Sequence, residues 1–310
     1  MSSLTVRAPA KLNLVLRVLG RRPDGYHELE TIFERIDLAD ELSFKAQPSG
    51  VALTCSEPEL SCGEDNLVMK AARLLQKATG AAAGARIHLT KRIPIAAGLG
   101  GGSSDAAAAL VGLNRLWGLG LERSKLVELA AQLGSDVPFF LADSPFAIGR
   151  GRGEQCEPLE GPSLAHVLVV PNERLSTKEV YEGFSAQFVE GFDLTDEKPS
   201  LSMVEHALRN GSLSELAEGL WNDLEPEAIR RCPVIALCQS RLKDLGCPGV
   251  RVSGSGPSVF GLCRDTAHAR DVALRLPALL AVHLGSRTHS VPRIDVIHTD
   301  LSKKAPVSVA

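Results

Sequence analysis

The sequence predicts an α+β fold divided into two lobes. Segments with the two-residue alternation of strands are paired across turns as hairpins, and helical segments lie between them. They do not follow the regular strand–helix–strand order of a parallel sheet. A change in composition at 156–165, which is rich in Glu, Pro and Gly, indicates a junction between domains. We therefore expect domains at 1–158 and 159–300, followed by a disordered tail at 301–310.

Composition and charge narrow the classes of function. The chain has 310 residues, of which 44% are hydrophobic and 23% charged, as is ordinary for a soluble globular protein. Its net charge of −3 and the lack of a dense Lys/Arg block argue against nucleic acid as a partner. No apolar run approaches the ~20 residues of a membrane span, so no membrane partner is expected.

The cysteines and the N-terminal sequence predict a location. The seven cysteines form no Cys-x-x-Cys pair, which argues against a disulfide framework or a zinc cluster and for a reducing compartment. The N-terminal residues have neither an apolar signal core nor the character of a transit peptide. We expect a bacterial cytoplasmic protein that is a monomer or a weak homodimer.

A hairpin is expected at the start of the chain. Residues 4–18 alternate as a strand, a Pro-Asp-Gly turn follows, and a return strand at 29–44 is broken near 38–41. Lys11 and Asn13 share one face of the first strand, and a solvated sheet face is the usual explanation of such a pair. Tyr26 and His27 follow the turn; they are a base-binding pair or a strand-edge pair without a role.

A glycine-rich loop lies between a strand at 85–91 and a helix at 103–116. Its four glycines are Gly98, Gly100, Gly101 and Gly102. Glycines let backbone N–H groups converge on a ligand, and the helix N-terminus adds partial positive charge. This pattern favours a phosphate site. The alternative is a flexible loop whose Ser103 or Ser104 caps the helix. The loop lacks the Gly-Lys-Ser/Thr of a Walker A motif and the third glycine of a dinucleotide fingerprint.

Asp136 lies in an apolar segment, Val-Pro-Phe-Phe-Leu following it directly. A partly desolvated carboxylate would be a stronger base, but Asp136 is also a good N-cap for a short helical turn.

The other expected elements are a helix at 66–78 capped by Asp65 or Asn66, a helix at 122–133, an irregular turn at 149–154, a strand from His166, a helix started by Ser176 with Glu179, helices at 200–220 and 226–243, strands on either side of 253–256, a helix at 265–276, and strands near 281–290 and at 293–298.

Three motifs occur together: Pro-Ala-Lys-Leu-Asn at 9–13, Pro-x-x-x-Gly-Leu-Gly-x-x-Ser-Ser at 94–104, and Ser-Gly-Ser-Gly-Pro at 253–257. The trio resembles the signature motifs of the GHMP kinases, which include galactokinase, homoserine kinase and mevalonate kinase. The resemblance implies the two-domain architecture of that family. Its N-terminal lobe is like the second domain of ribosomal protein S5, and its C-terminal lobe is ferredoxin-like α/β.

Three further segments are similar to those of one branch of these kinases: Arg22-Pro-Asp-Gly-Tyr-His27, Asp65-Asn-Leu-Val68 and Gly134-Ser-Asp-Val-Pro-Phe-Phe140. In that branch the small-molecule acceptor is a cytidyl diphosphate of methylerythritol. The resemblance implies ATP-dependent phosphorylation of its 2-hydroxyl, a step in the non-mevalonate route to isoprenoid precursors.

The resemblance also implies residue roles. Asp136 matches the general base, and Lys11 matches the lysine beside it. On the acceptor side, Asn13 and His27 match cytidine or erythritol contacts, Tyr26 and Tyr181 match an aromatic sandwich around cytosine, and Gly254 and Gly256 match the motif that closes the floor of the site.

On the donor side, the cofactors implied are ATP and Mg²⁺. Asn66 and Lys91 match adenosine-side contacts, and either Ser104 or Asp105 could touch the metal. The matching phosphate loop consists of Pro94, Gly98, Leu99, Gly100, Gly101, Gly102, Ser103 and Ser104.

Two alternatives remain at this point. The first is a GHMP kinase directed at mevalonate or homoserine, against which the aromatic residues Tyr26 and Tyr181 argue, because small acyclic acids need no stacking walls. The second is a catalytically silent nucleotide-binding protein, against which the presence of both Lys11 and Asp136 argues.

Overall fold

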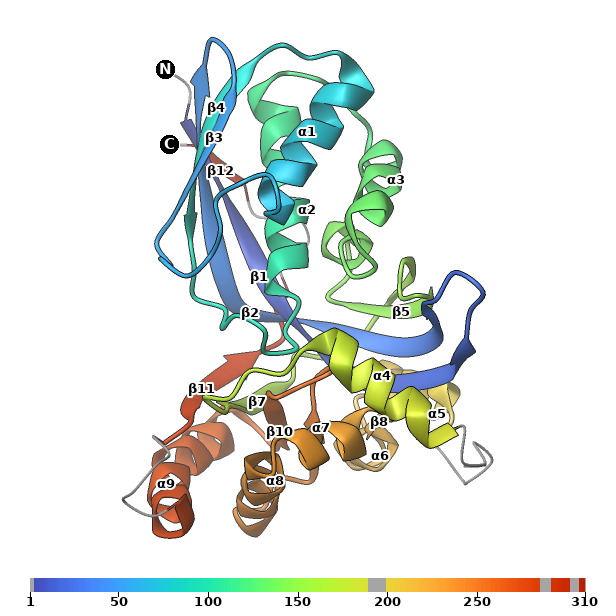
Figure 1. Cartoon of the computed structure of the whole chain (residues 1–310). Coiled ribbons are helices and arrows are strands. Elements are labelled where there is room, and N and C mark those ends of the chain that lie inside the picture. The colour runs from blue at the N-terminus through green and yellow to red at the C-terminus, as the bar shows by residue number, and fades with distance from the viewer. Residues whose placement is uncertain (1–2, 189–198, 285–290, 302–306, 310) are drawn as a thin grey trace.

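The computed structural model describes residues 3–188, 199–284, 291–301 and 307–309. It has two lobes, which are stacked in Figure 1. The upper lobe is an eight-stranded mixed sheet with helices on one face, and the lower lobe is a four-stranded antiparallel sheet with helices beneath it. This arrangement confirms the predicted two-lobed α+β fold. No helix in the described ranges is both long and apolar enough to cross a membrane.

The upper sheet is built on a long hairpin. β1 (Ser3–Arg21) pairs antiparallel with β2 (His27–Gln47) along almost its whole length. The predicted hairpin is therefore confirmed. The break expected near 38–41 is wrong, because β2 continues through it; the sheet instead absorbs the irregularity as a register shift between Pro9 and Ala10.

Helices cover the inner face of this sheet. Of the two predicted caps, Asp65 and Asn66, the structure selects Asn66, whose side chain accepts the Val68 N–H at 2.9 Å. A run of four buried alanines, Ala106 to Ala109, lets the helix that follows the glycine loop lie close to β1 and β2. The elements of this lobe after β2 are β3 (Val51–Cys55), α1 (Leu67–Thr79), β4 (Gly84–Thr90), α2 (Gly101–Leu116), α3 (Arg123–Leu133), the 3₁₀ helix η1 (Pro138–Leu141), β5 (Phe146–Gly151) and β6 (Gln155–Leu159). The irregular turn expected at 149–154 is partly wrong, because its first three residues belong to β5.

The lower lobe follows β6. Its sheet has the order β11–β7–β10–β9, and the Ser253–Gly256 turn joins its last two members, as predicted. The elements are β7 (Ala165–Val170), α4 (Thr177–Phe188), α5 (Leu201–Asn210), α6 (Leu213–Gly219), β8 (Trp221–Asn222), α7 (Glu225–Arg231), α8 (Val234–Asp244), β9 (Gly249–Val252), β10 (Val259–Cys263), α9 (Thr266–Leu284) and β11 (Arg293–His298). β8 does not belong to this sheet; it pairs parallel with β1 of the upper sheet.

Five expectations for this half of the chain need correction. The helices expected at 200–220 and 226–243 are each divided in two, the first at Gly211, which has φ 69°, and the second at Pro233. Helix α9 does not end at 276 but continues through Pro277 to Leu284, over part of the strand expected at 281–290; the remainder of that strand lies outside the described residues. Within the expected tail, β12 (Val307–Val309) pairs with β1, and 302–306 and 310 lie outside the described residues.

Three apolar cores hold the molecule together. One lies between the upper sheet and α1, α2 and α3, and another lies between the lower sheet and α4, α7, α8 and α9. The third joins the lobes, because Leu168 and Phe260 on the opposite face of the lower sheet pack with Leu12, Leu14 and Ile32 of β1 and β2. The position of one lobe on the other is therefore fixed by buried side chains.

A buried polar cluster crosses the same interface. Glu34 of β2 and His166 of β7 are both fully buried, with Oε2 and Nε2 2.9 Å apart. The Thr299 hydroxyl donates to Glu34 Oε1 at 2.6 Å and accepts the Leu164 N–H at 2.8 Å. Since each of these groups is removed from water, the lobes must stay in register for the bonds to form.

Candidate active site between the lobes

A cavity of about 1180 Å³ opens where β1, the glycine loop, α4 and the Ser253–Gly256 turn meet. It brings together residues from six separate parts of the sequence. The predicted site residues that line it are Lys11, Asn13, Tyr26, His27, Asn66, Lys91, Pro94, Gly98, Leu99, Gly100, Gly101, Gly102, Ser103, Asp136, Tyr181 and Gly254. Ser104 and Gly256 are not among the residues that line it.

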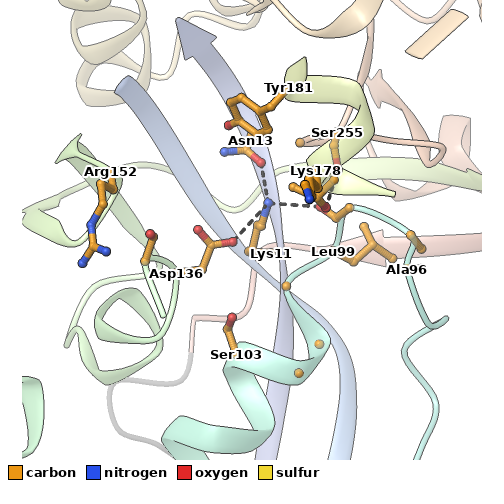
Figure 2. Close-up of a pocket in the computed structure, with 18 of the residues that line it drawn as sticks. Lys11, Asn13, Ala96, Leu99, Ser103, Asp136, Arg152, Lys178, Tyr181 and Ser255 are labelled. Atoms are coloured by element: carbon orange, nitrogen blue, oxygen red, sulfur yellow. Dashed lines mark hydrogen bonds and ion pairs between the residues drawn. The ribbon is translucent and has the colours of Figure 1, made fainter. Parts of the chain in front are cut away.

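Lys11 is the centre of the site (Figure 2). Its ammonium donates to Asn13 Oδ1 and, at 3.0 Å, to the Gly98 carbonyl, and it lies 3.7 Å from Asp136 Oδ2. Burial lowers the pKa of Lys11, although the Asp136 carboxylate opposes this effect. The Lys11 amino group is thus held in place beside an accessible carboxylate.

The solvated face considered for Lys11 and Asn13 is wrong. The alternation does place both on one face of β1, but the two residues are only 4% and 2% exposed. A Cβ built on Gly254 would lie 3.2 Å from Lys11 Nζ and 3.3 Å from Asn13 Oδ1, so the turn of the lower lobe covers them. Asn13 Nδ2 donates to Thr31 Oγ1 at 2.8 Å, which holds the amide in place.

Asp136 does not cap the helical turn that follows it. The N-cap of η1 is Val137, and no side-chain bond is made there. The Asp136 side chain is instead 32% exposed and faces Lys11 across the cavity (Figure 2). A carboxylate in this position can accept the proton of a hydroxyl group, while the neighbouring ammonium keeps the carboxylate ionised.

The glycine loop leads directly into α2. The N-cap is Gly100, with φ 69° and no side-chain cap, so the alternative in which Ser103 or Ser104 caps the helix is wrong. Ser104 donates the first helical hydrogen bond, to Gly100 O at 2.9 Å. The N–H groups that precede it have no intrahelical acceptor and, with the helix dipole, suit the phosphates of a nucleotide.

Gly98 joins this loop to the lower lobe. Its φ is 76°, and a Cβ at this position would lie 2.2 Å from the Ser253 carbonyl oxygen. The Ser253 hydroxyl also donates to the Gly98 carbonyl at 3.1 Å. Only glycine fits here, because both the backbone conformation and the neighbouring backbone exclude a side chain.

Ser104 and Gly256 lie behind the walls of the cavity. Ser104 is 1% exposed, and it lines a separate small cavity with Arg35 and Phe140. Its N–H is used within the helix, so neither the hydroxyl nor the N–H is directed at the large cavity. Gly256 packs against Val252 and Ala228.

Lys91 is held by two buried carboxylates at the start of α2. Its ammonium pairs with Asp40 Oδ2 and, at 2.9 Å, with Asp105 Oδ2. Burial alone would lower the pKa of Lys91, but Asp105 and Asp40 outweigh it and raise that pKa. Burial raises the pKa of Asp105 to about 7, against the pull of Lys91. Asp40 also accepts the Ile93 N–H at 2.8 Å and thereby fixes the entry to the glycine loop.

Aromatic residues line the opposite end of the cavity. The rings of His27 and Tyr181 stack, with centroids 5.0 Å apart and planes inclined by 30°. Tyr26 does not lie on Tyr181; it is 54% exposed, with the Arg152 guanidinium 4.8 Å from its ring centroid. Burial lowers the pKa of His27, and the charge of Arg21 adds to this, so the imidazole is neutral at pH 7. Burial raises the pKa of Tyr181.

Sequence reasoning did not identify several other residues that line the cavity. The hydroxyl groups of Thr177 and Ser255 lie 2.9 Å apart and tie α4 to the turn of the lower lobe. Lys178 and Arg152 also line it, from α4 and from the turn after β5 (Figure 2). Ser255 belongs to the 253–257 motif and Thr177 to the predicted helix start, but no local pattern marks Lys178 or Arg152 as site residues, because these join the site only through contacts between distant segments.

The two candidates for a Mg²⁺ ligand do not fit that role. Ser104 turns away from the cavity, and Asp105 is paired with an ammonium, which disfavours a second cation beside it. Within the described part of the chain, no three His, Cys, Asp or Glu side chains form a group that could hold a metal ion. We therefore derive no step through a metal bound to protein side chains.

Two family models match the chain. The model of the GHMP kinases N terminal domain matches residues 66–144, and that of the GHMP kinases C terminal domain matches residues 204–282. A protein of Pelotomaculum thermopropionicum named 4-diphosphocytidyl-2-C-methyl-D-erythritol kinase is 46% identical over 274 residues, which cover 88% of this chain and 93% of that protein. A protein of the same name from Moorella thermoacetica is 42% identical over 290 residues, which cover 93% of this chain and all of that protein.

Solved structures agree with these matches. A crystal structure of 4-(cytidine 5'-diphospho)-2C-methyl-D-erythritol kinase is 38% identical, with a TM-score of 0.76, and covers 96% of this chain and 99% of that chain. The homoserine kinase of Cytophaga hutchinsonii has a TM-score of 0.75 at 20% identity, covering 99% of this chain and 97% of that chain. The mevalonate kinase of L. major has a TM-score of 0.70 at 16% identity, covering 95% of each. The last two show a shared fold alone.

Proposed function

Because this chain belongs to the GHMP kinase family, and within it to the 4-diphosphocytidyl-2-C-methyl-D-erythritol kinases, we propose that its cavity binds ATP and that cytidyl diphosphate side by side. The reaction is ATP-dependent phosphorylation of the acceptor's 2-hydroxyl, which gives the 2-phosphate and ADP. It is a step of the non-mevalonate route to isoprenoid precursors. The observation that carries the proposal is the Lys11–Asp136 pair, 3.7 Å apart, beside the glycine loop.

ATP binds at the glycine loop in this proposal. The N–H groups at the start of α2 donate hydrogen bonds to the phosphates, and the Lys91 ammonium, which would lie 3.3 Å from a Cβ on Gly101, is next to them. Asn66 lines the adenosine side of the same cavity. We propose that ATP arrives as its Mg²⁺ complex, because the metal offsets the charge of the triphosphate.

Asp136 and Lys11 act on the acceptor hydroxyl. The carboxylate removes the proton as the oxygen attacks the γ-phosphorus, and the buried ammonium stabilises the negative charge that develops there. Lys11 is held by Asn13 and Gly98, so it does not have to be ordered during the reaction. Phosphoryl transfer depends mainly on such positioning and charge neutralisation.

The acceptor's cytosine lies at the aromatic end of the cavity. The stacked rings of His27 and Tyr181 provide an apolar wall and a neutral imidazole that can bond to the edge of a base. Tyr26 provides a second wall on the exposed side. With the acceptor's base there, its methylerythritol group extends toward Asp136.

The same proposal includes the cellular setting and the boundaries of the domains. The composition supports a cytoplasmic enzyme of bacterial type that acts on small molecules as a monomer or weak homodimer. The domains we propose are 1–158 and 159–300, since the described sheets change between β6 and β7.

The test is a coupled ADP-release assay with ATP and the cytidyl diphosphate, run beside mevalonate and homoserine. Asp136→Asn should lower kcat by ~10²–10⁴-fold, because it removes the base, while ATP affinity stays that of the wild type. Asp143→Asn is the matched control, since this carboxylate follows the same segment but is 66% exposed. Preferred turnover of mevalonate, or wild-type kcat in Asp136→Asn, would overturn the proposal.

A further inference from the structure

The acceptor carries two phosphates between its cytosine and its methylerythritol, and none of the groups described so far neutralises them. We propose that Arg152 binds this diphosphate and so selects acceptors in which a nucleobase is joined through a diphosphate. This assignment rests on the function proposed above and makes Arg152 a specificity residue of the same reaction.

Arg152 lies on the far side of Asp136 from Lys11 (Figure 2). On one side, its guanidinium is 4.8 Å from the centroid of the Tyr26 ring. On the other, a Cβ built on the next residue, Gly153, would lie 3.8 Å from Asp136 Oδ1. An acceptor with its base beside Tyr26 and its hydroxyl at Asp136 therefore has Arg152 within the same wall of the cavity.

The other ammonium groups of the cavity are engaged elsewhere. Lys11 faces Asp136, and Lys91 is bound by Asp40 and Asp105 at the glycine loop. Lys178 lies on the glycine-loop side, near Ser255 (Figure 2). The remaining cations that line the cavity are Arg21, which is exposed beside His27, and Arg152, which is the one that lies over Tyr26.

Arg152 has hydrogen-bonding capacity to spare. Its ion pair with Glu154 is long, with 3.9 Å between Nε and Oε2, and its side chain is 27% exposed. The Glu154 carboxylate turns back to accept the N–H of Arg152 at 2.7 Å, which holds the turn in shape. The contact with the Tyr26 ring restricts the position of the guanidinium, whose several N–H groups suit phosphate oxygens.

Arg150 provides a matched control. It lies two residues earlier, on β5, and its guanidinium bonds to Glu157 at 3.1 Å. It is not among the residues that line the cavity, and the chain turns between the two arginines at Gly151, which has φ 73°. The two side chains therefore carry the same charge in neighbouring positions, but only Arg152 faces the acceptor.

The experiment compares CDP with cytidine as competitive inhibitors of the acceptor, in the wild type, Arg152→Gln, Arg152→Lys and Arg150→Gln. Cytidine lacks both phosphates, so the ratio of the two inhibition constants isolates their contribution. Arg152→Gln should weaken CDP by roughly 10- to 100-fold, as expected for a charge-assisted hydrogen bond, and leave cytidine unchanged. Arg152→Lys should weaken CDP by a smaller factor, and Arg150→Gln should not weaken it. The KM for ATP should stay constant.

The outcomes separate this inference from the function on which it rests. An unchanged ratio in Arg152→Gln, or an equal loss for CDP and cytidine, would overturn it, since the side chain would then act only through Tyr26 or through the shape of the turn. A wild-type enzyme that binds neither CDP nor cytidine would overturn the proposed acceptor and this inference together.

Discussion

Substitution of Gly98 by alanine should force the glycine loop away from the Ser253–Gly256 turn of the lower lobe, beside the proposed catalytic residue Lys11. The new Cβ would lie 2.2 Å from the Ser253 carbonyl oxygen and 3.0 Å from that of Gly256. Both contacts are with backbone, so no flexible side chain can move aside. The loop would have to lift away from the turn and lose the bonds that the Gly98 carbonyl accepts from Lys11 and Ser253.

Two costs contribute to the expected loss of stability. The left-handed backbone at φ 76° costs a residue with a Cβ about 1–2 kcal/mol. Forcing a methyl group into a packed contact adds about 1–3 kcal/mol. The free energy of unfolding should thus fall by about 2–5 kcal/mol.

Gly80→Ala measures the first cost alone. Gly80 ends α1 with φ 71°, but nothing lies within 4 Å of a Cβ built there. Urea unfolding of both variants should give about 1–2 kcal/mol for Gly80→Ala and a larger value for Gly98→Ala. The kcat of Gly98→Ala should also fall, because Lys11 loses one of its partners, whereas Gly80→Ala should keep wild-type kcat. Equal losses of stability with unchanged kcat in both variants would refute the tight contact between loop and turn.

Two further substitutions test the buried charges. Folding raises the pKa of Asp105 to about 7, so between about pH 4 and pH 7 the unfolded chain has lost this proton while the folded protein keeps it. The free energy of unfolding of the wild type should therefore decline over this range, by about 4 kcal/mol for the full shift. Asp105→Asn should remove this decline. Urea unfolding at pH 5 and pH 8 checks this, and a difference between the variants that does not grow with pH would contradict it. Glu34→Ala should cost about 2–5 kcal/mol, because it leaves His166 and Thr299 buried without their partner; denaturation beside the exposed-site control Glu157→Ala measures it, and equal stabilities would contradict it.

Features set by local chemistry could be predicted from the sequence. The glycine loop and α2 follow from glycines placed before a run of alanines, and the Asn66 cap from an amide that precedes apolar periodicity. The alternation of β1 correctly placed Lys11 and Asn13 on one face. It could not show that this face is buried, because the covering residue Ser253 is 240 positions away from Asn13.

The expectations that the structure corrects, and the residue that sequence reasoning missed, each have a physical cause. Gly211 adopts the left-handed conformation that ends a helix, yet a helical pattern resumes directly after it and hides the break. Pro277 predicts a helix end, but α9 continues through it, because a tertiary context can outweigh the loss of one hydrogen bond. Arg152 was not predicted at all. Its flanking glycines indicate a turn, whereas its role depends on Tyr26 and on the neighbourhood of Asp136.

The structure also indicates why one fold can serve kinases with different acceptors. Hydrogen bonds through the Gly98 carbonyl join Lys11 and Ser253 across the two lobes, so a change in any of these three residues should disturb the proposed phosphoryl-transfer site. Tyr26 and Arg152 instead lie on turns, and Tyr26 is 54% exposed, so their side chains can vary without disturbing the apolar cores. The two kinds of residue should therefore give different kinetic signatures. Gly98→Ala should lower kcat whichever acceptor is offered, and Arg152→Gln should raise KM only for acceptors that carry a diphosphate. Acceptor choice could then change by substitution in the turns while the reaction stays the same.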